Sequence, residues 1–321
     1  MSIQFRFRAE VWAAGFLLAT ALPVRSQVMY ERAGGETQHA TGQDVAPVFE
    51  GWEKNTDGTF SLVFGYMNRN YQQEVDIPIG PDNKIEPGLP DQGQPTHFYV
   101  RRQQFVFKVR VPADWGDKEL WWTLTLGGKA NKVHGVLDPV WELGSLVYQE
   151  NRRGPGETSY PSEAEAPPTI EMVGLSQLTA TVGQPLTLTV DLSDDGHPVP
   201  VIRRRNTSSA NSGGPRQNPA FPTPPPDNPV AQAVVRLEPG SRLGVTWVQF
   251  RGQGGVHFDP MRVSVANLDP LATVATADPQ QGRATTHVTF SEPGTYHLRA
   301  YGDDGILVTP LDVTVTVTPA K

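Results

Sequence analysis

The residues that could do chemistry are scattered along this 321-residue sequence instead of forming a known catalytic motif. Neither G-x-S-x-G nor H-E-x-x-H occurs, and the absence of cysteine removes thiol nucleophiles, disulfides and thiolate metal sites. Two acidic pairs, Asp194-Asp195 and Asp303-Asp304, each stand directly before glycine. That order is typical of turns, since aspartate bonds its own backbone and glycine adopts positive φ. We therefore predict no catalytic residue.

The histidines offer no clear metal site. His287 and His297 are the closest pair, and both alternate outward from strands that we expect in different sheets, so their side chains should diverge. His97 lies beside a proline-rich stretch, and we expect it at the surface with a hydrogen-bond partner. A functional role for this loop histidine is the alternative.

Calcium is the metal that loop residues of this chain could hold, because loop carboxylates and amides supply the oxygens that it prefers. Asn55 and Asp57, together with Asp82 and Asn83, could contribute such oxygens. No D-x-D-x-D-G loop is present, however. The expectation is no cofactor and no metal, with structural calcium as the alternative.

The strongest functional hint is aromatic. In the alternating run Leu120–Leu126, Trp122 shares a face with the leucines and Trp121 points the opposite way. Trp121 could be covered by the loop 79–95 or by a second domain, could form a protein interface, or could stack on a sugar ring. Trp115 and Trp141 belong to the same region. The speculative binding residues are Trp121, Tyr66, Tyr71 and Trp52.

The N-terminus points to export, and the net charge bears on the partners of the chain. Arg6 and Arg8 precede an uncharged apolar run over 11–22, and small residues before Gln27 fit a signal-peptidase site, which predicts a signal peptide over 1–26. A retained membrane anchor is the alternative. Removing this segment takes away three arginines and one glutamate, so the net charge changes from −7 to −9. An acidic chain is a poor binder of nucleic acid or anionic membrane.

Thirty prolines and 31 glycines favour short strands and turns over long helices. After a flexible leader over 27–43, residues 44–145 carry alternating strands at 58–66, 105–111 and 120–126, and Gly127-Gly128 predicts a hairpin turn. Phe105, Phe107, Val109 and Val111 are expected on one face. The stretch 79–95 is predicted to be a long loop. These features predict a first β-sandwich.

A patternless stretch over 146–168 is interpreted as a linker, and residues 169–321 as a second β-sandwich. Its expected strands cover 183–192, 244–250, 285–290, 295–301 and 312–317. The segment 203–229 contains three consecutive arginines and a proline run, and is predicted to be a disordered insertion whose charges are solvated.

Residues 170–318 resemble the PKD-like and immunoglobulin-like domains of bacterial surface and secreted proteins. Tyr296 resembles the family's tyrosine-corner residue, and Leu298 and Leu188 occupy the two positions of its cysteine pair. Trp247 matches the core tryptophan, and Asp303-Asp304-Gly305 the closing turn. The first region, through the run Gly51-Trp52 to Gly65-Tyr-Met-Asn-Arg-Asn70, resembles an uncharacterised family of secreted bacterial proteins.

The sequence therefore predicts an all-β chain of two tandem immunoglobulin-like β-sandwiches. The expected function is a non-enzymatic interaction or scaffold protein, periplasmic or extracellular, with no transmembrane segment once the signal is removed. Its partner would be a protein or polysaccharide of the envelope. A carbohydrate-binding accessory protein is the main alternative, and an enzyme with a loop-built site is a third.

Overall fold

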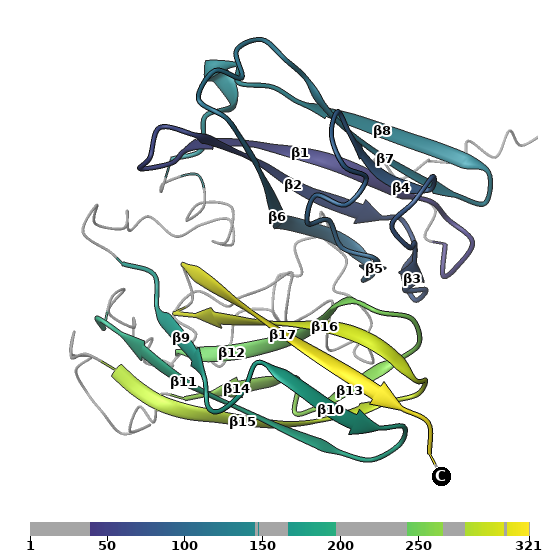
Figure 1. Ribbon diagram of the computed structural model, residues 1–321, viewed down its shortest axis with the longest axis vertical. Coiled ribbons are helices and arrows are strands. Elements are labelled where there is room, and N and C mark those ends of the chain that lie inside the picture. The colour runs from purple at the N-terminus through teal and green to yellow at the C-terminus, as the bar shows by residue number, and fades with distance from the viewer. Residues whose placement is uncertain are drawn as a thin grey trace, which may run out of the picture. The chain divides into compact units, whose positions relative to one another are not determined.

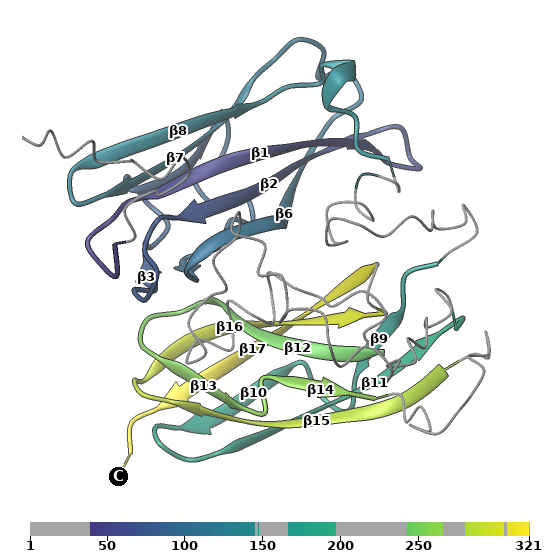
Figure 2. The ribbon, with the colours of Figure 1, turned by 180° about the vertical axis from the view of Figure 1, so that it is seen from behind.

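The computed structural model describes residues 39–144, 147, 166–196, 243–265, 280–304 and 307–320. The predicted signal peptide, the start of the leader, nearly all of the linker and the whole insertion over 203–229 lie outside these residues. The described part is all-β, in two immunoglobulin-like β-sandwiches, as the sequence predicted (Figures 1 and 2).

The first sandwich has its strands in the sheets β1-β2-β6 and β4-β7-β8, with a small pair β3-β5. The strands are β1 (Val45–Lys54), β2 (Phe60–Asn68), β3 (Val75–Asp76), β4 (Asn83–Glu86), β5 (His97–Phe98), β6 (Arg101–Val111), β7 (Leu120–Leu126) and β8 (Lys129–Gly135). A 3-10 turn, η1 (Pro139–Trp141), follows. Gly127 and Gly128 both have positive φ and form the predicted turn between β7 and β8.

The core of this sandwich confirms most of the predicted alternation. Phe107, Val109 and Val111 are buried, and Trp122 lies between the sheets with its indole N–H donated to Asn83 Oδ1 at 3.1 Å. Phe105 was predicted to share their face, but this was wrong. It adopts a positive φ of 51° beside a break in the β2–β6 register, and such a bulge disturbs the alternation of inward and outward side chains.

The predicted loop over 79–95 contains a strand. β4 pairs with β7, and its single inward apolar residue, Ile85, is fully buried. The outer edge of β4 is covered by side chains of the following turn: Gln92 donates to Ile85 O at 3.2 Å, and Gln94 to Asn83 O at 3.5 Å. These side chains occupy carbonyls that another chain could otherwise bond.

The second sandwich packs the sheet β13-β15-β11-β9 against the sheet β10-β17-β16-β12-β14 (Figures 1 and 2). The strands are β9 (Thr169–Met172), β10 (Gln177–Thr181), β11 (Leu186–Asp194), β12 (Gly244–Arg251), β13 (Val256–Asp259), β14 (Arg262–Ser264), β15 (Gln280–Phe290), β16 (Gly294–Asp303) and β17 (Val308–Thr318). The five predicted strands are β11, β12, β15, β16 and β17. The short strands β9, β10, β13 and β14 were not predicted.

The core of the second sandwich confirms the resemblance at the level of the immunoglobulin-like fold. Leu188, Trp247 and Leu298 are fully buried in one cluster. The Tyr296 hydroxyl, which has one proton to donate, lies within hydrogen-bond distance of Gln253 O and, at 2.9 Å, of Glu292 O, and such a bond to the backbone is that of a tyrosine corner.

Both acidic pairs lie where a strand ends in a turn. Asp194, the last residue of β11, accepts the N–H of Gly196 with its Oδ2 at 2.9 Å, and Asp304 accepts the N–H of Leu307 with its Oδ1 at 2.7 Å, as expected of turns. Asp303 is the fully buried last residue of β16. It accepts two hydrogen bonds from the Arg262 guanidinium, at 2.5 and 3.0 Å.

The end of the predicted leader is bound to the first sandwich. The carbonyls of His39 and Ala40 accept the N–H groups of Tyr71 and Gln72, and the N–H of Gln43 is donated to Asn70 Oδ1. Residues 39–43 therefore belong to the folded unit.

Candidate functional site at the junction of the sandwiches

Contact between the two sandwiches begins at the edge of β12. β14 pairs only with the first residues of this strand, from Gly244 to Thr246. Farther along, the first sandwich supplies the partners: the Tyr99 hydroxyl accepts the N–H of Gln249 at 2.7 Å, and the N–H of Thr96 is donated to Phe250 O at 3.1 Å. The first sandwich thus satisfies backbone groups that would otherwise form an open strand edge.

Arg251 ties the end of β12 to the turn after β4. Its guanidinium forms two hydrogen bonds with the Asp91 carboxylate, at 2.8 and 2.9 Å, and its Nε donates to Gln94 O at 2.8 Å. The Arg251 bonds hold the pKa of Asp91 below its usual range. Because the pair has two parallel hydrogen bonds, it fixes the orientation of the Arg251 guanidinium relative to the Asp91 carboxylate as well as the distance between them.

An apolar contact completes the junction. Phe250 of the second sandwich belongs to the buried cluster of the first. The Arg299 guanidinium lies 3.8 Å from the centre of the Phe250 ring and donates to Val106 O at 2.8 Å, and it donates two further hydrogen bonds to the Asp312 carboxylate, at 2.6 and 2.9 Å. Cation–π stacking and charge-assisted bonding both hold Arg299 in place.

A buried histidine lies beside these contacts. His97 was predicted at the surface, but it is 7% exposed because β3 and Tyr99 pack around it. Its Nδ1 is 2.7 Å from Asp76 Oδ1 and its Nε2 is 3.2 Å from Glu74 Oε2. Burial alone would lower the pKa of His97, but the two carboxylates outweigh it and raise the pKa to about 9.

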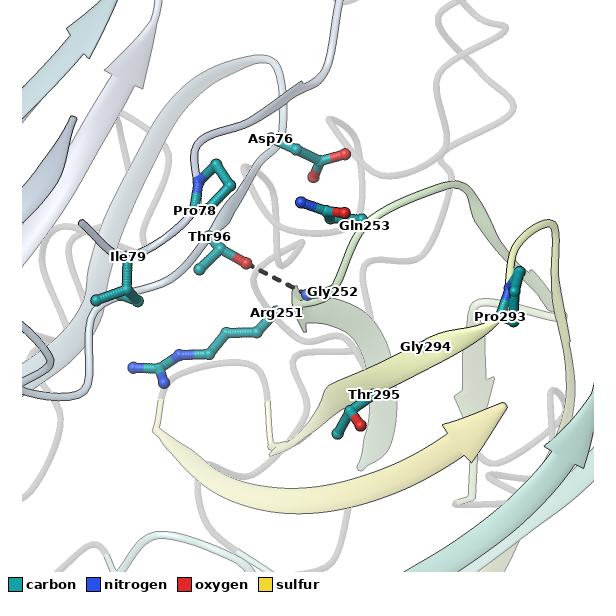
Figure 3. Close-up of a pocket in the computed structure, with 10 residues that line it drawn as sticks. All are labelled: Asp76, Pro78, Ile79, Thr96, Arg251, Gly252, Gln253, Pro293, Gly294 and Thr295. Atoms are coloured by element: carbon teal, nitrogen blue, oxygen red, sulfur yellow. Dashed lines mark hydrogen bonds between the residues drawn. The ribbon is translucent and has the colours of Figure 1, made fainter. Parts of the chain in front are cut away.

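A pocket of about 280 Å³ opens at this junction (Figure 3). Both sandwiches line it, and Asp76 and Gln253 point into the same side of it. The N–H of Gly252 is donated to Thr96 Oγ1 at 3.2 Å on its floor. Its lining residues are Asp76, Pro78, Ile79, Thr96, Arg251, Gly252, Gln253, Pro293, Gly294 and Thr295.

The structure does not bring the four predicted aromatic residues together. Trp52 and Tyr66 are buried, at 8% and 2% exposure: the Trp52 indole is donated to Asp138 O, and the Tyr66 hydroxyl accepts the N–H of Tyr99. The prediction that these two residues are exposed for binding was wrong, because their positions in the strands face the core. The ring of Tyr71 is covered by the Arg101 guanidinium at 3.9 Å.

Trp121 remains exposed, at 37%. Its indole N–H is donated to Glu119 Oε2 at 3.0 Å, and its ring contacts His134 edge-on. Neither the stretch 79–95 nor the second sandwich buries it. Of the three readings of Trp121, burial is therefore wrong, and a protein interface or stacking on a sugar ring stays a prediction.

Three of the four residues considered for calcium have side-chain oxygens with other partners. Asn55 Oδ1 accepts from the Ser61 hydroxyl, Asp57 Oδ1 accepts the N–H of Thr59, and the buried Asn83 Oδ1 accepts the Trp122 indole N–H. Across the described ranges, no three histidine or acidic side chains are placed to hold a metal ion. Within the same ranges, no helix is long and apolar enough to cross a membrane.

His287 and His297 lie on β15 and β16, in different sheets, as expected. Each has a threonine partner across its strand pair: Thr187 for His287, and Thr314 for His297.

Sequence reasoning missed the junction residues. Glu74 and Asp76 flank the buried Val75, and His97 lies 21 residues beyond Asp76. Arg251 and Asp91 are 160 residues apart. The one local signal is the sequence Glu74-Val-Asp76, in which two carboxylates share the face opposite an inward valine.

No family model and no curated protein matches this sequence. Among solved structures, the S-layer protein rSbsC(31–844) aligns with 86% of this chain at 11% identity and a TM-score of 0.23, and this chain spans 28% of its length. Fibronectin(III)-like modules of CbhA from Clostridium thermocellum align at 10% identity and a TM-score of 0.20, over 85% of this chain and 95% of theirs. Titin domains A168–A170 align at 12% identity and a TM-score of 0.19, over 86% and 68%.

Proposed function

We propose that this chain is an exported, non-enzymatic interaction or scaffold protein of the cell envelope or extracellular space. The junction carries the proposal. Tyr99, Arg251 and Arg299 use their polar groups to join one sandwich to the other. These side chains hold the two sandwiches in a fixed relation, which is what a scaffold requires.

Export is proposed from the sequence features of residues 1–26, and the PKD-like relationship of the second sandwich is proposed from the residues that carry the resemblance. A stable fold outside the cell without disulfides must rest on its cores and on the junction. Two large clusters of buried side chains supply this packing.

The test is a pull-down with the chain from residue 27, which the predicted cleavage would leave. We expect retention on envelope fractions, and loss of retention when those fractions are first treated with protease. Retention on insoluble polysaccharide, abolished by Trp121→Ala, would replace the proposal with carbohydrate binding. Reproducible turnover that is lost on mutating the junction carboxylates would replace it with an enzyme.

A further inference from the structure

The junction pocket combines a carboxylate with apolar walls. Pro78, Ile79 and Pro293 form apolar parts of its lining, while Asp76 and Gln253 point into it. At about 280 Å³ it lies just below the roughly 300–1,000 Å³ of pockets that take drug-sized ligands. A single extended side chain is an occupant of suitable size.

One carboxylate oxygen of the pocket is available. Asp76 Oδ1 is bound to His97 Nδ1, whereas Asp76 Oδ2 has no hydrogen-bond partner within the described part of the chain. The side chains of Gln253 and Thr295 likewise make no hydrogen bond there, and both residues are exposed. The pocket therefore presents polar groups that a ligand can engage.

The charged side chains that line the pocket, taken with their ion-pair partners, leave one negative charge in excess. Both ring nitrogens of His97 face carboxylate oxygens, so both must donate, which only the imidazolium form can do. His97 thus offsets one of the two charges of Glu74 and Asp76. Arg251 lines the pocket, but Asp91 offsets its charge through the forked pair. A cation is the ligand that this balance favours.

We propose that this pocket binds the ammonium or guanidinium group of a lysine or arginine side chain from a protein partner. The group donates to Asp76 Oδ2, and the aliphatic stem lies along Pro78, Ile79 and Pro293. The inference rests on the proposed function, and assigns to it a site and a ligand class. His97 acts by holding the Asp76 carboxylate in position.

The test uses Nα-acetyl-lysine methylamide as the probe, with the norleucine analogue as a neutral control of the same stem. Binding to the full exported chain is followed by NMR shifts of the backbone amide of Gly252 and the side-chain amide of Gln253. A single side chain should bind with a dissociation constant on the order of 1 mM. We expect shifts with the lysine probe and none with norleucine.

Two variants locate the cation. Asp76→Asn should weaken binding about tenfold or more, since it removes a charge-assisted bond. Glu74→Gln is the matched control: it removes an equal charge from the same histidine, but Glu74 does not line the pocket, so the loss should be clearly smaller than in Asp76→Asn. Thermal melting shows whether each variant is folded.

A third variant leaves the His97 pairs intact. Thr295→Lys places a tethered ammonium in the lining and should block the probe, whereas Gln281→Lys, an equal charge on β15, should not. Equal binding of norleucine, or equal loss in Glu74→Gln and Asp76→Asn, would overturn the proposal. If envelope retention persists while the probe fails, the pocket assignment falls and the proposed function stands.

Discussion

Tyr99→Phe tests whether the junction is held by specific bonds. The Tyr99 hydroxyl accepts the N–H of Gln249 at 2.7 Å, and the two residues are 7% and 2% exposed. Removing the oxygen leaves a buried N–H without its acceptor, which costs about 1–3 kcal/mol. For a chain of this size, each kcal/mol lowers the melting temperature by about 2–4 °C.

The matched control is Tyr66→Phe. The Tyr66 hydroxyl is as deeply buried, and it accepts the N–H of Tyr99 at 2.9 Å, within the first sandwich. Both variants should lower the free energy of unfolding in urea by similar amounts. Only Tyr99→Phe should directly expose the Gln249 amide.

Hydrogen exchange of the Gln249 amide separates the two variants. With a loss of about 1.4 kcal/mol in local protection, exchange in Tyr99→Phe should be about tenfold faster than in the unmodified chain. In Tyr66→Phe it should change far less. Unchanged exchange in Tyr99→Phe, or an equal change in both variants, would refute the assignment of this bond to the junction.

Three further predictions concern stability. His97 has a pKa of about 9 in the folded chain against 6.5 when unperturbed. Its protonation therefore stabilises the fold by about 3 kcal/mol at most, fully below pH 6.5, and this stabilisation is lost as the pH rises through 9. In urea unfolding at increasing pH, the free energy of unfolding of His97→Gln should not show this loss. Tyr296→Phe removes the hydroxyl bonded to Glu292 O and should cost about 1–2 kcal/mol, and a melting temperature equal to that of the unmodified chain would contradict it. Asp303→Asn breaks the buried pair with Arg262 and should lower the free energy of unfolding, measured by denaturant titration, by about 2 kcal/mol or more. Neither high nor low salt should restore this loss.

The sequence predicted the fold where apolar residues alternate over long runs. β11 and β17 show this pattern, and Trp247 and Tyr296 occupy the core positions that the resemblance implied. Alternation of this kind reports which face of a strand is buried, and two such faces suffice to indicate a sandwich.

The short strands were not predicted, because each contains too few residues to show an alternation of apolar and polar side chains. β4 has one inward apolar residue, Ile85, among residues typical of turns, and its pairing with β7 depends on contacts distant in sequence. Phe105 followed the alternation of its strand, but the β2–β6 register shifts beside it, and a bulge of this kind leaves no mark in the alternating pattern.

The candidate site at the junction was not predicted, for a related reason. An exposed tryptophan is visible in an alternating strand, so Trp121 was identified. The junction instead joins polar residues whose partners lie far away in sequence, as with Tyr99 and Gln249. Polar residues of this kind carry no periodic signal, and only the tertiary structure brings them together.

The most direct test of the central claim is the pull-down with the chain from residue 27, on envelope fractions with and without protease treatment. The account predicts retention that protease treatment of the envelope abolishes and that Trp121→Ala leaves unchanged. Retention that survives protease and is lost with Trp121→Ala would contradict it, and would assign the chain to the carbohydrate-binding proteins.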